Sequence, residues 1–534
     1  MAWRIISLVL GLSAVASSQH EYSNPSISCS DLSSSFVREN VTIHFADFVA
    51  AGTNLTLDQT GLLPECERPS QVAPVDLCRI AMNVTTSARS EIYMEAWLPS
   101  NWTGRFLATG NGGLGGCVQY EDVAYGASLG FATVGSNNGH QGTRGLAFYQ
   151  NADIVEDFSY RSILTETLVG KAITSAYYSK SHKKSYYIGC STGGRQGFKM
   201  AQSFPSLFDG IVAGAPALSF NNLSSWSGHF YPITGSPDSP SYLPPSLWAA
   251  VHTDILTQCD GLDGVEDGIL EDPSLCHYKP VSLQCRSNQP STSTTPCLTA
   301  AQVLTVSAVL ADYHGENGAL IFPRMQPGTE LSAPYIYYNG QGFQYTLDWM
   351  RYAILQDPSW DAATLNSTYA AISDLTNPSD IETWNGDLAP FRDHGGKILH
   401  YHGLADAIIT SENSPRYYEH VATTMNASPA DLDEFYRFFR VGGMGHCAGG
   451  DGAWDIGQGA GGSTDPERNV LTRMVRWVEE GAEAAPEVLV GTKFVNDTAE
   501  LGVELERKHC KWPLRNLCVD PGNHKSPEAW KCVP

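Results

Sequence analysis

The sequence predicts an α/β fold with a mostly parallel sheet, interrupted by a long insertion and rich in disulfides. Two observations lead to this prediction. Several apolar, β-like runs end in loops of glycine and small polar residues, and a stretch with helical spacing stands between two of them. A third observation, a change of pattern after residue 220, indicates the insertion.

Strand, helix and strand follow one another in the first part of the chain. Residues 87–110 are strand-rich, because EIYMEAWLP alternates polar and apolar residues and RFLATGNGGLGG ends a strand in a glycine-rich loop. GFATVGSNNGH and KSYYIGCSTGGRQG repeat this pattern, and residues 156–180 between them carry apolar residues at helical spacing. This order predicts βαβ units.

After DGIVAGAPAL the pattern changes. Residues 221–390 contain four cysteines, the low-complexity stretch SNQPSTSTTP and no clean βαβ repeat. GGKILHYHGLADAII then resumes as a buried strand, and EFYRFFRVGGMGH and the helix ERNVLTRMVRWVEEG follow. We therefore expect a catalytic α/β domain made of residues 19–220 and 391–534, with residues 221–390 as a lid domain.

Composition excludes several classes of protein. The 534 residues are 42% hydrophobic and include 50 Gly and 30 Pro, which excludes wholesale disorder and a long coiled coil. The formal net charge of −23 argues against nucleic acid and anionic membrane surfaces as partners. Oligomeric state is not predicted.

The N-terminus predicts export. Arg4, the apolar run 5–15 and the small residues Ala16 and Ser18 fit a signal peptide over residues 1–18, although a short core helix is the alternative. Eight N-x-[ST] sequons favour a secreted, extracellular glycoprotein. They are Asn40, Asn54, Asn83, Asn101, Asn222, Asn366, Asn426 and Asn496. In that compartment most of the 13 cysteines are expected to form disulfides rather than bind metal.

Ser191 is the candidate nucleophile. It occupies the centre of Gly-Cys-Ser-Thr-Gly, which matches G-x-S-x-G between an apolar strand and a helix-compatible run. Small residues permit a sharp turn that exposes the serine hydroxyl at a helix N-terminus. The alternative is a plain glycine-rich turn.

A nucleophilic serine needs an imidazole base that is oriented by a carboxylate. Asp406 follows the strand KILHYHG, and His446 follows the strand-like EFYRFFRV. The order Ser191, Asp406, His446 is that of an α/β-hydrolase, and each residue follows a β-like run. We expect all three at one edge of the sheet.

Two cysteines flank this candidate dyad. Cys190 precedes the serine and Cys447 follows the histidine. If they pair, their bridge joins the two halves of the site. Otherwise each pairs elsewhere, or Cys190 is a buried thiol.

The tetrahedral oxyanion needs hydrogen-bond donors. Thr192 is expected to supply one N–H, and Gly112 or Gly113 in the loop after GRFLAT a second. That loop lacks the context of a dinucleotide site, and no P-loop is present, so no organic cofactor is expected.

Residues 259–269 pack four acids and three glycines into eleven residues. Carboxylates this close repel one another unless a cation neutralises them, and Ca²⁺ is the natural choice outside the cell. The spacing is not that of an EF-hand. A structural ion is favoured over a catalytic one, and a solvated acidic turn is the alternative.

Taken together, these motifs resemble the tannase and feruloyl esterase family of secreted, mainly fungal hydrolases, and within it most resemble the feruloyl esterase B type. The likeness covers essentially the whole mature chain and depends most on the Cys-Ser and His-Cys dipeptides. It also includes the segments VDLCRIAMNVTTS, GRFLATGNGGLGGCVQ, CDGLDGVEDGILEDP and GMGHC.

The resemblance implies Ser191 as acyl-enzyme nucleophile, His446 as base and Asp406 as the residue that orients it. It also implies a Ca²⁺ ion bound by Asp260, Asp263, the Val265 carbonyl, Asp267 and the Ile269 carbonyl. The implied disulfides are Cys190–Cys447, Cys29–Cys78, Cys66–Cys117, Cys259–Cys276, Cys285–Cys297 and Cys510–Cys532, which leave Cys518 without a partner.

We therefore expect a serine carboxylesterase that acts on feruloylated plant cell-wall saccharides or small hydroxycinnamate esters. The alternatives are a tannase that cleaves gallate esters and a non-catalytic, calcium-stabilised glycan-binding protein. The aromatic residues Tyr337, Tyr338, Phe343 and Trp349 fit an acyl pocket and a lid core equally well.

Overall fold

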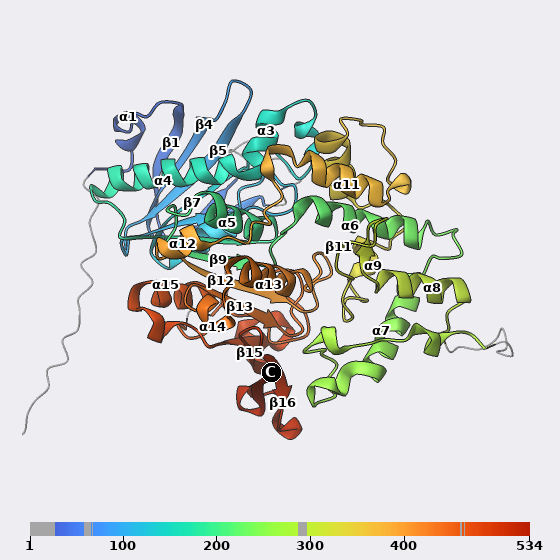
Figure 1. The fold of residues 1–534 in the computed structure, drawn as a ribbon. Helices are drawn as coiled ribbons and strands as arrows, with labels where there is room; N and C mark the ends of the chain where they lie inside the picture. The colour runs from blue at the N-terminus through green and yellow to red at the C-terminus, as the bar shows by residue number, and fades with distance from the viewer. Residues whose placement is uncertain (1–26, 58–65, 67, 287–295, 460–461, 464) are drawn as a thin grey trace, which may run out of the picture.

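A nine-stranded mixed sheet forms the centre of the computed structural model, which describes residues 27–57, 66, 68–286, 296–459, 462–463 and 465–534 (Figure 1). In spatial order its strands are β1 (Val41–Val49), β4 (Leu77–Thr85), β5 (Glu91–Pro99), β7 (Phe131–Ser136), β6 (Arg105–Thr109), β8 (Lys184–Cys190), β9 (Gly210–Gly214), β12 (Lys397–Gly403) and β13 (Tyr436–Val441). Strands from β7 to β13 pair in parallel. The antiparallel edge β1–β4–β5 extends the parallel sheet that the sequence predicts.

Helices cover both faces of this sheet, as an α/β fold requires. The apolar side chains of α4 (Ser162–Tyr178), α5 (Thr192–Ser203), α12 (Ala389–Asp393) and α13 (Asn413–Met425) join one core cluster. Those of α15 (Val470–Glu480) join a second cluster, and most of those of α2 (Tyr120–Ser128) join a third. The two helices predicted over 156–180 and in ERNVLTRMVRWVEEG are confirmed by α4 and α15. The short helices α1 (Leu32–Ser35), α3 (Ala152–Glu156) and α14 (Pro429–Leu432) complete this part of the fold.

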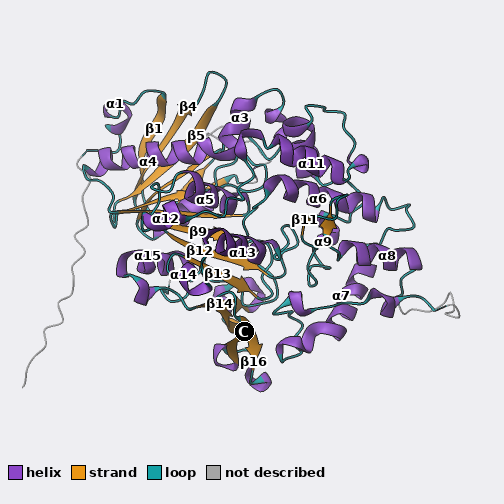
Figure 2. Ribbon diagram, in the orientation of Figure 1, coloured by secondary structure: helices purple, strands orange, loops and turns teal. Residues whose placement is uncertain are grey.

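The described residues of the predicted lid domain contribute no strand to the nine-stranded sheet. Figure 2 shows this region as mainly helices and loops beside the sheet. Its elements are α6 (Phe220–Thr234), α7 (Pro245–Cys259), α8 (Ala300–Val309), β10 (Tyr313–His314), β11 (Leu320–Phe322), α9 (Ala333–Ile336), α10 (Gln344–Asp348) and α11 (Ser367–Thr376). A core of buried aromatic side chains, including Trp226, Phe230, Trp248 and Trp349, holds them together. The exact limits of this domain stay a prediction.

Two hairpins follow α15 at the C-terminal end of the chain, which Figure 1 shows in dark red. They are β14–β15 (Val488–Phe494 and Val503–Cys510) and β16–β17 (Arg515–Cys518 and Trp530–Val533). A further small pair, β2–β3, joins Asn54–Thr56 to Ser70–Val72. The sequence patterns gave no expectation for these elements.

All six disulfides implied by the family resemblance are present. They are Cys29–Cys78, Cys66–Cys117, Cys190–Cys447, Cys259–Cys276, Cys285–Cys297 and Cys510–Cys532. Cys518 is buried and forms no disulfide. Of the helices in the described ranges, none has the length and apolar character needed to cross a bilayer.

Candidate active site

Ser191 stands on a sharp turn between β8 and α5. Its φ of 65° and ψ of −123° lie in a region that residues other than glycine rarely adopt. Neighbouring glycines make the turn possible, because a Cβ atom on Gly189 would lie 2.8 Å from the backbone of Gly193 and one on Gly194 would lie 2.4 Å from the carbonyl oxygen of Gly214. The Ser191 N–H donates to that same Gly214 oxygen at 3.0 Å. The predicted strand–turn–helix is therefore present, with the serine at the N-terminus of α5.

Asp406 and His446 follow two neighbouring parallel strands, β12 and β13, and their side chains meet. His446 Nδ1 lies 2.7 Å from Asp406 Oδ2. The N–H groups of Ile408 and Ile409 donate to Asp406 Oδ1 at 2.8 and 2.9 Å. Burial alone would raise the pKa of Asp406, but the nearby His446 and His402 outweigh it and hold the pKa well below its usual range. Asp406 is therefore an ionised carboxylate that binds one nitrogen of His446 and leaves Nε2 for another partner.

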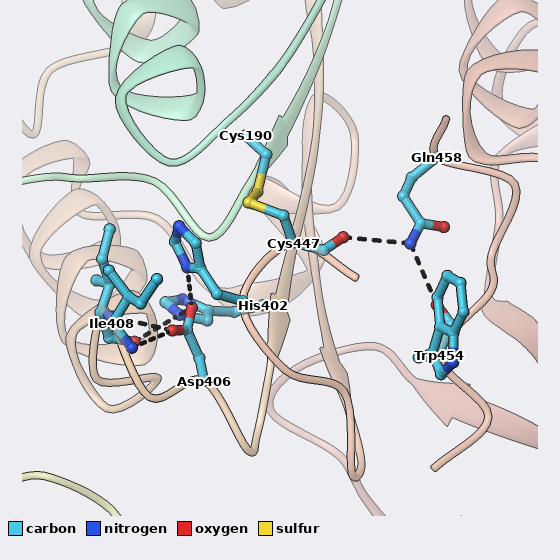
Figure 3. Close-up of a disulfide and its surroundings, with 9 residues drawn as sticks. Cys190, His402, Asp406, Ile408, Cys447, Trp454 and Gln458 are labelled. Carbon is cyan, nitrogen blue, oxygen red and sulfur yellow. Dashed lines mark hydrogen bonds and ion pairs between the residues drawn. A yellow bond between two sulfur atoms is a disulfide. The ribbon is translucent and has the colours of Figure 1, made fainter. Parts of the chain in front are cut away.

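A disulfide joins the two loops that carry Ser191 and His446. Cys190 and Cys447 are 257 residues apart in sequence, and their Cα atoms are 5.9 Å apart. Figure 3 draws this bond together with Asp406. Gln458 Nε2 donates to the Cys447 carbonyl at 3.2 Å and supports the same loop. Because each cysteine is the immediate neighbour of a candidate catalytic residue, the bond fixes how far the two residues can separate.

The glycine loop after β6 is attached to the nucleophile helix. Thr192 Oγ1 donates to the carbonyl oxygen of Gly113 at 2.7 Å. Gln196, one turn further along α5, accepts from the Asn111 N–H at 3.0 Å and donates to Asn111 Oδ1 at 3.1 Å. Within the part of the chain that the structure describes, the N–H groups of Gly112, Gly113 and Thr192 donate no hydrogen bond to the protein. These three groups are therefore available as donors to an oxyanion.

Ser191 borders two cavities. One is an open cleft of about 770 Å³ that Ser191 and His446 both line, together with Gly112 and Gly113. The other is a narrow slot between the catalytic residues and the lid. Its lining is mainly apolar and aromatic: Gly113, Leu114, Ser191, Thr192, Ala217, Phe220, Leu223, Ser224, Ser227, Tyr337, Phe343, Tyr345, Thr346, Ile408 and Ile409. Tyr345 borders both cavities, and its hydroxyl lies over Gly113.

The structure separates the four aromatic residues that the sequence could not assign to either the acyl pocket or the lid core. Tyr337 and Phe343 line the slot, whereas Tyr338 and Trp349 are buried in the lid core. Among its polar residues, Ser224 is 8% exposed, and its Oγ has no hydrogen-bond partner among the described residues. The free volume of the slot is about 50 Å³.

The acidic loop offers oxygen ligands, although its side chains are not gathered around one point. No group of three or more His, Cys, Asp and Glu side chains in the described ranges forms a ready metal site. Asp263 is nevertheless buried, and burial, together with the charges of Glu271 and Asp267, raises its pKa to about 7. A bound cation would lower this penalty, and Asp260, Asp263, Asp267 and the carbonyls of Val265 and Ile269 offer the oxygen ligands that Ca²⁺ prefers.

The sequons differ in exposure. The asparagines at five of them are exposed, namely Asn40, Asn54, Asn366, Asn426 and Asn496, and those at Asn83, Asn101 and Asn222 are half-buried. Asn83 also donates to Glu91 Oε1 at 2.8 Å. The five exposed sequons are therefore the more accessible to a glycosylating enzyme. The predicted signal peptide, residues 1–18, lies outside the described residues.

Sequence reasoning missed three residues of this region: Gln196, Ser224 and His402. His402 is the second histidine on Asp406, with its Nε2 3.2 Å from Asp406 Oδ2. A signal for it exists in LHYHG, because residues two apart on a strand share a face and His400 and His402 must point the same way. Gln196 and Ser224 carry no comparable signal.

Comparison with known proteins agrees with the resemblance seen in the motifs. The family model described as "Tannase and feruloyl esterase" matches residues 78–533. A protein from Aspergillus terreus named "Probable feruloyl esterase B-2" is 53% identical over 496 residues, 92% of this chain and 93% of that protein. The crystal structure of feruloyl esterase B from Aspergillus oryzae has a TM-score of 0.91 at 51% identity, covering 95% of this chain and 99% of that one. Tannin acyl hydrolase from Aspergillus niger has the same fold, with a TM-score of 0.72 at 22% identity over 94% of this chain and 93% of that one.

Proposed function

Because the chain belongs to the tannase and feruloyl esterase family and is thus a carboxylic ester hydrolase, we propose that it is a secreted serine esterase that releases hydroxycinnamic acids such as ferulate from plant cell-wall saccharides. The observation that supports the serine mechanism most is the disulfide between the neighbours of Ser191 and His446, beside an Asp406 that binds His446. Together these supply a candidate nucleophile and base in one cleft, with a buried orienting carboxylate behind the base.

Acylation begins when Ser191 Oγ attacks the ester carbonyl and its proton passes to His446 Nε2. Asp406, ionised and bonded to Nδ1, stabilises the imidazolium that results. The oxyanion accepts from the N–H of Thr192 and from that of Gly112 or Gly113. The N-terminal end of the α5 dipole favours the same negative charge.

The tetrahedral intermediate collapses when the bond from the acyl carbon to the alcohol oxygen breaks. His446 gives its proton to that oxygen, and the alcohol, a sugar in the proposed substrate, leaves through the open cleft. Water then attacks the acyl-enzyme as His446 takes one of its protons. The bond from the acyl carbon to Ser191 Oγ breaks, His446 returns the proton to Oγ, and the carboxylic acid departs.

The slot accounts for the proposed acyl group. Its apolar and aromatic lining, which includes Phe220, Tyr337 and Phe343, suits the phenylpropenoyl skeleton. Ser224 offers a buried hydroxyl without a partner among the described residues, which suits the phenolic oxygen of ferulate. The open cleft on the other side of Ser191 receives the alcohol.

Hydrolysis of methyl ferulate, methyl caffeate, methyl sinapate and propyl gallate by the native chain and by Ser191→Ala tests the proposal. We expect turnover of the hydroxycinnamates and a loss of at least about 10⁴-fold in kcat for Ser191→Ala. Ser203→Ala, at the exposed end of the same helix, is the matched control. Full activity of Ser191→Ala would refute the serine mechanism, and preferential gallate turnover would favour a tannase.

We also propose that Asp260, Asp263 and Asp267, with the carbonyls of Val265 and Ile269, hold a structural Ca²⁺ ion that neutralises the loop. After treatment with a chelator, Ca²⁺ should raise the melting temperature of the native chain but not of Asp263→Asn. Asp238→Asn, in an exposed lid loop, is the control. No Ca²⁺-dependent change in the native chain would contradict the site.

Export and glycosylation complete the proposal. Five of the eight sequon asparagines are exposed, which supports modification there. An N-terminal sequence beginning at Gln19 and a loss of mass on enzymatic deglycosylation are the expected results. A culture supernatant that lacks the protein would contradict export.

A further inference from the structure

Two histidines, rather than one, contact the carboxylate of Asp406. Besides His446, the Nε2 atom of His402 lies 3.2 Å from Asp406 Oδ2 (Figure 3). The same Nε2 lies 3.1 Å from the carbonyl oxygen of Ile409. Both neighbours are pure acceptors, because Asp406 is ionised, so Nε2 of His402 must carry a hydrogen. The His402 ring is fully buried on β12.

The other side of His402 continues into a buried chain of hydrogen bonds. His402 Nδ1 lies 2.6 Å from Ser414 Oγ on α13. Ser414 Oγ lies 2.9 Å from His400 Nε2, and His400 Nδ1 lies 2.9 Å from the Tyr436 hydroxyl on β13. Each of these four residues is at most 1% exposed. The chain therefore crosses three elements of the fold and ends on the carboxylate of the candidate triad.

The hydrogens in this chain can run in one direction. Burial raises the pKa of Tyr436 far above its ordinary value, so its hydroxyl keeps a hydrogen, and among the described residues His400 Nδ1 is the acceptor within reach. Burial, assisted by His402, holds the pKa of His400 well below its ordinary value, so His400 is neutral and donates from Nε2 to Ser414. Ser414 then donates to His402 Nδ1, and His402 donates from Nε2 to Asp406.

We propose that His402 is a positioning residue of the esterase, which the chain Tyr436–His400–Ser414 holds in the tautomer that donates to Asp406. This inference rests on the proposed function, in which Asp406 orients His446. Asp406 is then bound on both oxygens, by the N–H groups of Ile408 and Ile409 on Oδ1 and by the two histidines on Oδ2. The carboxylate cannot rotate without breaking at least two of these bonds, so the direction it presents to His446 is fixed.

The other groups near this carboxylate do not replace His402. The Tyr337 hydroxyl donates to the Ile408 carbonyl at 2.5 Å and faces Asp406 from the lid. Gln326 Nε2 donates to the backbone oxygen of Asp406 at 2.7 Å, not to its side chain. Phe198 of α5 packs edge-on against the His400 ring, with 5.4 Å between ring centroids. Among the described residues, His402 and His446 are thus the side chains that hydrogen-bond to the carboxylate.

Loss of the His402 donor has a specific expected signature. Without the hydrogen bond from His402, the negative charge of Asp406 would interact more strongly with His446 and favour its imidazolium form. The acidic limb of the kcat/KM profile would therefore move to higher pH by about one unit. Freer rotation of the carboxylate should lower kcat by about 10- to 100-fold. KM should change little, because His402 lines neither cavity.

A first experiment uses the unmodified protein. Labelling of histidine with ¹⁵N and long-range ¹H–¹⁵N correlation reports which nitrogen of each ring carries the hydrogen. We expect both His402 and His400 as neutral rings protonated on Nε2 at neutral pH. A His402 ring protonated on Nδ1, alone or together with Nε2, would overturn the proposed direction of the chain.

A second experiment compares His402→Leu, which removes the donor, with His402→Gln, whose amide can still donate to Asp406. The Leu variant should lose kcat and shift the acidic limb, and the Gln variant should recover the native pH profile at least in part. The control is His420→Leu, which replaces a half-buried histidine on α13 that stacks on Trp384. This variant should keep the native kcat and the native pH profile. A folded His402→Leu with native kcat and pH profile would overturn the positioning role. Full activity of Ser191→Ala would instead overturn the serine mechanism.

Discussion

The two walls of the candidate active site are held together by different interactions. On the catalytic side, a disulfide, charged hydrogen bonds and a turn shaped by glycines hold Ser191, Asp406 and His446. On the lid side, the slot is formed by aromatic packing, as in the edge-to-face contact of Phe343 with Tyr345 at 5.1 Å between ring centroids. Covalent bonds and hydrogen bonds fix distance and direction closely, whereas apolar packing leaves more freedom.

This difference teaches which wall carries which property. A change on the catalytic wall should lower the rate for every ester, because all substrates share the same chemistry. A change on the lid wall should alter the order of preference among acyl groups and leave the chemistry intact. Packed side chains can also adjust to different acyl groups more readily than a cross-linked loop can.

The largest effect should come from Asp406→Asn. The amide keeps the size of the side chain but cannot stabilise the imidazolium of His446, so kcat should fall by about 10⁴-fold for every substrate. Steady-state kinetics on methyl ferulate and methyl sinapate measure it. Asp451→Asn, exposed in the His446 loop, is the control. A loss that differed strongly between the two esters would contradict the separation of the two walls.

Removal of the disulfide should come next. Cys190→Ala combined with Cys447→Ala should lower kcat/KM by about 10- to 100-fold, since the Ser191–His446 geometry loosens, and should lower stability by about 2–5 kcal/mol. Cys285→Ala with Cys297→Ala removes a lid disulfide that spans 12 residues and should leave kcat/KM near native. Equal losses of activity in the two pairs would mean that the active-site bond acts only through stability.

Ser224→Ala should have a smaller and selective effect. Loss of one neutral hydrogen bond to the phenol should reduce kcat/KM for methyl ferulate by about 5-fold. It should leave methyl 3,4-dimethoxycinnamate, which lacks the phenolic hydrogen, nearly unchanged. Ser225→Ala, buried on the same helix but outside the slot lining, is the control. An equal loss for both esters would contradict a contact between Ser224 and the phenol.

The smallest effect should come from Glu382→Gln, beside the start of α6, where the chain passes from the catalytic domain into the lid. Glu382 accepts from Ser219 Oγ and from the Asn221 N–H where the chain enters α6, and burial raises its pKa to about 7. The folded state therefore holds this proton after the unfolded chain has released it, so Glu382 should lower stability as pH rises from 4.5 to about 7. The melting temperature of Glu382→Gln minus that of the native chain should be about 1–2 °C larger at pH 8 than at pH 4.5. The native pH dependence in this variant would contradict the assignment.

The sequence predicted the catalytic wall better than the lid wall, for a physical reason. Ser191, Asp406 and His446 each follow a β-like run, and strands that run in parallel end at the same edge. No comparable rule predicts which residues line the slot. Tyr337 lines it, whereas its sequence neighbour Tyr338 lies in the lid core. Their separation depends on how the lid helices pack, which no local pattern records.

The buried hydrogen-bond chain behind Asp406 shows the same limit. Two histidines on one face of β12 can be read from the sequence, but their partner Ser414 belongs to α13, and the register between strand and helix decides the contact. The antiparallel edge β1–β4–β5 was also unpredicted, because its pairing joins strands whose order follows from the whole sheet.

The span of the active-site disulfide has a consequence for how the protein is made. Five of the six disulfides join cysteines 12 to 51 residues apart, so both partners leave the ribosome close together. Cys190 and Cys447 are separated by 257 residues, so Cys190 emerges long before its partner and cannot form its native bond until Cys447 follows. During that interval it can be captured by another cysteine of the growing chain. The native disulfide at this position therefore forms only after residue 447 has been synthesised. A chain that ends before Cys447 lacks the bond next to Ser191.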